Sequence, residues 1–166
     1  MVVHNKRGSH AEMVLEAYLK TLKAVCSRSE LKDLRKCDFV IYINWAPCDK
    51  CAKTLRKVFD FCGKGSVCFT GLYTKQNDED ASYANYKGWK MLEEHVVFEY
   101  MTKHDYEKLN FTSLTTSKIE ESNKKHTIYA LNKMPESKMD SVKSFLEKLW
   151  RDDSAKQSIN YLLIGL

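Results

Sequence analysis

The chain has 166 residues, of which 43% are hydrophobic, and its formal net charge is +5. This length and composition suit one globular domain over residues 1–166, with room for a sizeable core. No stretch is long and apolar enough to cross a membrane, and the N-terminus lacks an apolar signal region, so we expect no membrane partner. The positive charge permits a polyanionic partner but does not by itself indicate one.

The hydrophobic pattern predicts helices and strands that alternate along the chain. Apolar residues recur at helical spacing in three segments, 11–26, 49–61 and 82–94. Short apolar runs, typical of buried strands, occupy three others, 39–43, 67–73 and 96–101. Because strands separated by helices need crossover connections, we expect an α/β fold in which helices cover a sheet with parallel pairs.

The remaining segments are mostly polar. We expect residues 110–138, which are polar and weakly periodic, to form a loop with one short helix. Two amphipathic segments follow, at about 139–151 and 155–164. The chain shows no internal repeat and no low-complexity linker.

Two short motifs contain residues that bind metals. His10 and Glu12 stand near the start, and Cys48 and Cys51 follow Pro47 in a Pro-Cys-x-x-Cys sequence. One imidazole and two thiolates hold zinc with a fourth tetrahedral position open for water, as expected of a catalytic rather than a structural site. We therefore predict one catalytic Zn²⁺ held by His10, Cys48 and Cys51.

Glu12 supplies a carboxylate that need not bind this metal. Water on zinc loses a proton near neutral pH, and a neighbouring carboxylate can take that proton and deliver it to a substrate. The three-residue spacing of Cys48 and Cys51 places both sulfurs on one side of a first helical turn, for which Pro47 is a suitable entry. The positive end of that helix favours the thiolate forms.

A lone Cys-x-x-Cys is also found as a redox pair or as half of a structural zinc site. A closed structural site needs four Cys or His ligands, and the other cysteines form no second pair of this kind. These are Cys26, Cys37, Cys62 and Cys68. They lie in apolar stretches, so we interpret them as small core residues. Unpaired cysteines indicate a reducing compartment, so we expect a cytoplasmic or nuclear protein.

The residues around these motifs carry a wider resemblance. Four segments read Asn-Lys-Arg-Gly-Ser-His-Ala-Glu (5–12), Ile-Asn-Trp-Ala-Pro-Cys (43–48), Thr-Gly-Leu-Tyr (70–73) and Met-Thr-Lys-His-Asp-Tyr (101–106). His-x-Glu followed by Pro-Cys-x-x-Cys is the signature of zinc-dependent nucleobase deaminases. The Trp-x-Pro-Cys and Gly-Leu-Tyr contexts narrow this to a chain that resembles the AID/APOBEC-like polynucleotide cytidine deaminases over about residues 3–109.

The resemblance implies a three-layer α/β/α cytidine deaminase-like fold with a central mixed sheet of about five strands. It implies hydrolytic deamination of cytosine to uracil in single-stranded DNA or RNA, with Glu12 as the proton shuttle and zinc-bound water as the nucleophile. Genome defence, receptor diversification and transcript editing all use this chemistry. We expect a monomer.

The resemblance also implies roles for matching residues. Trp45 and Tyr73 would wall the pocket around the target base. The full set of expected substrate-binding residues is Asn5, Ala11, Trp45, Ala46 and Tyr73. The expected nucleic-acid contacts are Lys6, Arg7, Thr74, Lys75 and Gln76. Aromatic rings in a basic groove also suit single-strand binding physically. The alternatives are simple core packing for the two aromatic rings and a solvated surface for the basic residues.

The chain departs from the family pattern in four places. The gap between the two zinc motifs is longer than usual, and we expect the polar segment Ser27–Lys36 to hold the extra residues as a loop. Ala46 stands where the family has Ser, and Gly71 stands where it has Arg. Only nine residues precede His10, whereas the family has a helix, a strand and a substrate-contacting loop there. We therefore expect the N-terminal helix and strand to be absent or truncated. Either the chain is a shortened form, or another element covers the strand edge that would be left unpaired.

Three functions compete on the sequence alone. The first is deamination of cytosine in single-stranded DNA or RNA. The second is deamination of free cytidine or a nucleotide by the same metal chemistry. The third is a catalytically silent, zinc-stabilised nucleic-acid-binding module. Glu12 favours an enzyme, because a purely structural zinc site has no need of a proton shuttle.

Overall fold

The structure is a computed structural model that describes residues 10–36, 38–62, 65–74, 78–110 and 116–149. Its strands are β1 (Phe39–Trp45), β2 (Gly65–Gly71) and β3 (Val97–Tyr100). The helices of the first half are α1 (Ala11–Val25), α2 (Arg28–Leu34), α3 (Asp49–Cys62) and α4 (Glu79–Glu93). Those of the second half are α5 (Lys103–Lys108), α6 (Thr116–Leu131), the short 3-10 helix η1 (Glu136–Lys138) and α7 (Met139–Lys148).

The strands form one parallel sheet in the order β1-β2-β3. In the register of the sheet, Phe69 lies between Ile43 of β1 and Tyr100 of β3. This confirms an α/β fold with parallel strands joined through helices. The described residues contain three strands, however, and all are parallel, so the expected mixed sheet of about five strands is not what this part of the chain forms.

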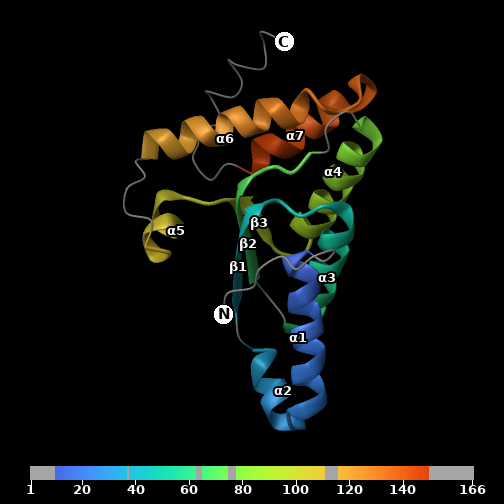
Figure 1. Cartoon of the computed structure of the whole chain (residues 1–166), viewed down its shortest axis with the longest axis vertical. Helices are drawn as coiled ribbons and strands as arrows, with labels where there is room; N and C mark the ends of the chain where they lie inside the picture. The colour runs from blue at the N-terminus through green and yellow to red at the C-terminus, as the bar shows by residue number, and fades with distance from the viewer. Residues whose placement is uncertain (1–9, 37, 63–64, 75–77, 111–115, 150–166) are drawn as a thin grey trace.

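The helices fall into three groups around the sheet (Figure 1). Helices α1, α3 and α4 lie together on one side, and α5 lies on the other. Helix α6 runs across the end of the sheet where the strands finish, close to Trp45 and Gly71, and α7 lies beside α6. Of the helices in the described ranges, none is both long and apolar enough to cross a lipid bilayer.

The main core lies between the sheet and the α3–α4 pair and continues into buried residues of α6 and α7. Leu55 of α3, Phe69 of β2 and Trp89 of α4 have no exposed surface, and burial of such side chains is the largest favourable contribution to folding. Helix α1 packs less deeply. Its single buried residue, Leu19, contacts Val58 of α3 in a smaller cluster.

The predicted segment Ser27–Lys36 is not a loop but contains helix α2. Ser27 and Glu30 form a capping box, in which the Ser27 backbone N–H donates to the Glu30 carboxylate at 2.7 Å. Such reciprocal capping satisfies N–H groups at a helix start and stabilises a short helix without an apolar stripe. The extra residues between the two motifs therefore form a capped helix rather than the expected loop.

The prediction of a loop with a short helix over residues 110–138 was also wrong, because α6 has 16 residues. Its buried side includes the polar residues Asn123 and Thr127 beside Ile119 and Ala130. The Thr127 hydroxyl donates to the Asn123 carbonyl at 2.9 Å and lies 2.8 Å from the Tyr100 hydroxyl. Polar side chains at inward positions conceal a helical period.

The other predicted elements are confirmed within a few residues. Strand β2 ends at Gly71, two residues before the predicted limit of 73, so Leu72 and Tyr73 follow the strand. Helix α7 accounts for most of the amphipathic segment 139–151. The second amphipathic segment, 155–164, lies outside the described residues.

Candidate metal centre

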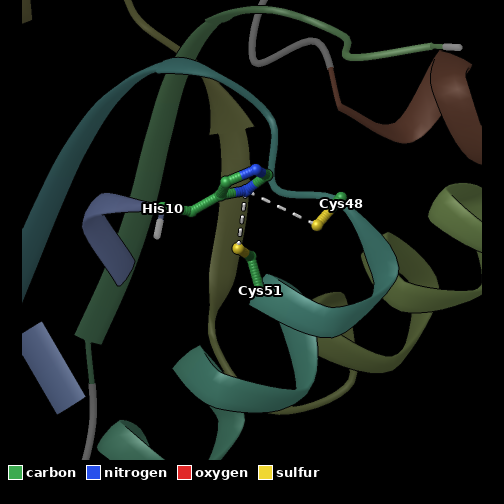
Figure 2. A group of neighbouring side chains, drawn as sticks. All are labelled: His10, Cys48 and Cys51. Carbon is green, nitrogen blue, oxygen red and sulfur yellow. Dashed lines mark hydrogen bonds between the residues drawn. The ribbon is translucent and has the colours of Figure 1, made fainter. Parts of the chain in front are cut away.

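His10, Cys48 and Cys51 meet at the end of the sheet where the strands finish (Figure 2). The His10 Nδ1 atom lies 3.1 Å from the Cys51 sulfur and 3.7 Å from the Cys48 sulfur. The three potential ligand atoms all lie within 4.8 Å of one another. Residues 38 positions apart in the sequence are thus brought together as a group that can hold a metal ion.

These distances fit zinc. With Zn–S bonds of about 2.3 Å and Zn–N bonds of about 2.0–2.1 Å, tetrahedral ligation separates a sulfur from a nitrogen by roughly 3.6 Å. The observed 3.1 and 3.7 Å bracket that separation. Among the described residues, this is the one such group of three His, Cys, Asp or Glu side chains. A tetrahedral metal held here keeps one position for water or substrate.

All three candidate ligands lie at or next to the N-terminal end of a helix. Cys48 directly precedes α3, and its carbonyl accepts the Ala52 N–H at 2.8 Å, so Cys51 falls in the first turn on the same side. His10 directly precedes α1 in an extended conformation, and its carbonyl accepts the Met13 N–H at 3.0 Å. The N-terminal ends of two helices therefore meet, and their dipoles favour thiolate sulfur.

Neither Cys48 nor Cys51 forms a disulfide bond. A hydrogen bond from Cys51 lowers the pKa of Cys48 to about 5. The same hydrogen bond, followed by burial and then by the Glu12 carboxylate, raises the pKa of Cys51. The hydrogen bond therefore favours a state in which the two sulfur atoms share one proton. A divalent metal would displace that proton, because the thiolate is the ligand form.

Glu12 lies beside this centre without belonging to the ligand group. It is the second residue of α1, it is partly buried, and its carboxylate is one cause of the raised pKa of Cys51. A carboxylate therefore lies at the edge of the candidate metal centre.

Two exposed aromatic residues stand at the same end of the sheet. Trp45 ends β1 and is 50% exposed, and Tyr73 follows β2 and is 40% exposed. Such exposure weighs against core packing as their purpose. The Trp45 ring packs edge-on against His126 of α6, with 5.0 Å between ring centroids. Burial, followed by the neighbouring Lys125, lowers the pKa of His126.

Gly71 leaves room for this arrangement. A Cβ atom built at Gly71 would lie 2.9 Å from the Trp45 ring and 3.2 Å from His126. Any larger residue with the Trp45 ring in place would force one of the rings to move. Glycine at this position therefore fits the two rings that pack over it.

The remaining predicted substrate residues have mixed positions. Ala11 is the first residue of α1 and is partly buried. Ala46 is buried, and its N–H donates to the Gly71 carbonyl at 2.7 Å. The hydroxyl of Thr74 is buried and has no hydrogen-bond partner within the described ranges. Five predicted residues, Asn5, Lys6, Arg7, Lys75 and Gln76, lie outside the described residues.

Sequence reasoning missed residues of α4 and α6 that support this end of the sheet. Asn85 accepts the Asp49 N–H, the Trp89 indole N–H donates to the Pro47 carbonyl, and His126 contacts Trp45. Asn85 and Trp89 are four positions apart and so lie on one helix face, a pattern that could have indicated a supporting role for that face. Their partners lie far away in the sequence, so the pattern alone did not name them.

The other cysteines stay outside the metal group. Cys68 is buried in β2, as predicted for a core residue, and Cys26 is partly buried at the end of α1. Cys37 and the side chain of Cys62 lie outside the part of the chain that the structure describes.

Neither a scan against protein-family models nor a search of curated proteins finds a match for this chain. The interpretation of the centre therefore depends on the motif and its geometry.

Proposed function

We propose that this protein is a zinc-dependent cytidine deaminase of the AID/APOBEC-like type, acting on cytosine in single-stranded DNA or RNA. The observation that carries the proposal is the convergence of His10, Cys48 and Cys51 with Glu12 beside them. A ligand set of three, accompanied by a carboxylate that need not bind metal, suits hydrolysis better than structural support. The fold would then be a variant of the three-layer cytidine deaminase-like architecture.

Bound zinc would supply Lewis-acid activation of a water molecule at its open position. Glu12 would take a proton from the attacking water as the C4–O bond forms, deliver it to the ring nitrogen, and assist transfer to the amino group. The C4–N bond then breaks, and ammonia leaves. One water and one cytosine give one uracil and one ammonia, so the reaction needs no further reactant.

The exposed aromatic residues support a polynucleotide as the substrate. Trp45 and Tyr73 stand at the ends of adjacent strands and present rings on which unpaired bases can stack. The net charge of +5 is compatible with a polyanionic partner. An unpaired strand also gives access to the base without the cost of extracting it from a duplex.

The test is uracil formation from single-stranded DNA, single-stranded RNA and free cytidine by the zinc-loaded protein. Glu12→Gln should lower turnover by about 10²–10⁴-fold, because general acid–base catalysis contributes about that much. It should leave zinc content and fold unchanged. The matched control is Glu16→Gln, one turn further along α1, where the carboxylate pairs with Lys20 at 3.0 Å. That variant should keep full turnover.

Each outcome has a distinct meaning. Product from a polynucleotide, lost in Glu12→Gln and kept in Glu16→Gln, supports the proposal. Product from free cytidine alone overturns the substrate class. A folded, zinc-loaded protein that deaminates none of the three substrates overturns the enzyme, and salt-dependent binding to single strands would then favour the silent binding module.

A further inference from the structure

Helix α4 contacts the segment that carries Cys48 and Cys51. Three of its residues, Asn85, Gly88 and Trp89, lie on one face at spacings of three and four. All three are buried. Each meets the Pro47–Asp49 segment or the first turn of α3.

Two of these contacts fix the backbone on either side of Cys48. The Trp89 indole N–H donates to the Pro47 carbonyl at 2.7 Å, and the Asp49 N–H donates to the Asn85 side-chain oxygen at 2.9 Å. A helix cannot satisfy the N–H groups of its own first turn, so Asn85 provides for α3 what a local cap would otherwise supply. Cys48 is thus held by its immediate neighbours.

Gly88 allows α4 to pack close to α3, because it has no side chain. A Cβ atom at this position would lie 2.9 Å from the Ala52 Cβ and 3.1 Å from the Asp49 Cα. The first turn of α3 and the middle of α4 are therefore in direct contact at the metal-binding segment.

Asn85 has a second contact that the other two residues lack. Its side-chain N–H donates to the Tyr73 carbonyl at 3.1 Å. One amide, 4% exposed, thus bonds both to the residue after Cys48 and to Tyr73 at the end of the neighbouring strand. Only a group that is donor and acceptor at once can make both bonds.

We infer that Asn85 is a positioning residue that fixes the Cys48 ligand relative to the Tyr73 backbone. It touches neither the metal group nor the expected base position, so it acts through the two segments that it joins. The part of this inference that concerns Cys48 depends only on the metal site. The part that concerns Tyr73 and substrate rests on the proposed deaminase function.

The test is to measure the visible spectrum of the Co²⁺-loaded full chain, and Zn²⁺ affinity by competition with a chelator, in Asn85 variants. Asn85→Ser reaches neither partner and adds no charge, whereas Asn85→Asp keeps the acceptor for Asp49 and loses only the donor to Tyr73. We expect Asn85→Ser to change the cobalt d–d bands and to weaken Zn²⁺ binding by about 10–100-fold, the usual effect of losing an outer partner of a metal site. Asn85→Asp should change both by less, because the bond beside Cys48 remains.

The matched control is Tyr86→Phe, at the next position of α4. The Tyr86 hydroxyl donates to the Ser141 carbonyl at 3.2 Å, so this variant also loses a hydrogen bond, but on the side facing α7. It should lower the melting temperature and leave the cobalt spectrum and Zn²⁺ affinity unchanged. The same result in folded Asn85→Ser would overturn the inference.

Turnover tests separately the part of the inference that concerns Tyr73 and substrate. If the wild-type protein deaminates single strands, Asn85→Ser should lower kcat and raise KM together, because ligand and pocket wall both shift, whereas Tyr86→Phe should change neither. If the wild-type protein deaminates no substrate, the proposed function fails, and the cobalt spectrum still decides the role of Asn85 at the metal site.

Discussion

The two halves of the metal centre are held in different ways. Cys48 and Cys51 belong to a segment that is bonded to α4 and packed into the main core, and Cys51 is 1% exposed. His10 is exposed and stands at the start of α1, whose single buried residue is Leu19. The cysteine half is therefore fixed by tertiary contacts, whereas the histidine half depends on the packing of one helix.

Because of this difference, a bound metal ion should also stabilise the fold. An ion bound by all three residues would link α1 to α3 by bonds that are stronger than the contacts between the two helices. Metal binding free energy then appears as stability, because the complete site does not exist in the unfolded chain. We expect the first turn of α1 to gain more from the metal than the first turn of α3.

The largest effect is expected from removing a ligand in the cysteine half. Structural zinc sites bind with about 10–16 kcal/mol, so loss of one of three protein ligands should cost roughly 3–5 kcal/mol of that free energy. Cys51→Ser should therefore lose zinc in a chelator competition and lower the melting temperature of the zinc-loaded protein. Full zinc occupancy with an unchanged melting temperature would show that the ligand set is wrong.

A smaller effect is expected from loosening the support of the cysteine half. Trp89→Phe keeps the ring in the core but leaves the Pro47 carbonyl without its 2.7 Å partner. An unsatisfied buried acceptor costs about 1–3 kcal/mol, which urea denaturation of the metal-free protein would measure. Trp45→Phe is the control, since that ring is half exposed and should change the free energy of unfolding by less than about 0.5 kcal/mol.

The smallest effect on the metal-free fold is expected at His10. The side chain is exposed, so His10→Ala should change the free energy of unfolding without metal by less than about 0.5 kcal/mol. The same variant should lose most of the stabilisation that added zinc gives the wild-type protein. If His10→Ala unfolded the metal-free protein, the contrast between the two halves would not hold.

The parts of this structure that could be predicted from sequence have local causes. The period of apolar residues gave α1 and α3, and the chemistry of imidazole and thiolate gave the candidate ligands directly from residue identity. Helix α2 was not predicted, because it is stabilised by the capping pair Ser27 and Glu30 rather than by an apolar stripe. This capping interaction is also local in the sequence, but it leaves no apolar period.

The parts that could not be predicted depend on contacts between distant segments. Asn85 and Trp89 support the cysteine segment through groups 36 and 42 positions away, and nothing in the sequence of α4 identifies those partners. The inward Asn123 and Thr127 of α6 look like surface residues until Tyr100 is placed beside them. Likewise, the number of strands in the sheet is a property of pairing, which an apolar run does not specify.

We propose that this protein holds zinc in an open site with three protein ligands, two of them sulfur. The measurement to make first is X-ray absorption of the zinc-loaded protein. We expect two sulfur atoms at about 2.3 Å and two nitrogen or oxygen atoms at about 2.0–2.1 Å, one of the latter being lost in His10→Ala and the other exchangeable with solvent. A shell of four protein ligands, or a spectrum unchanged by His10→Ala, would contradict it.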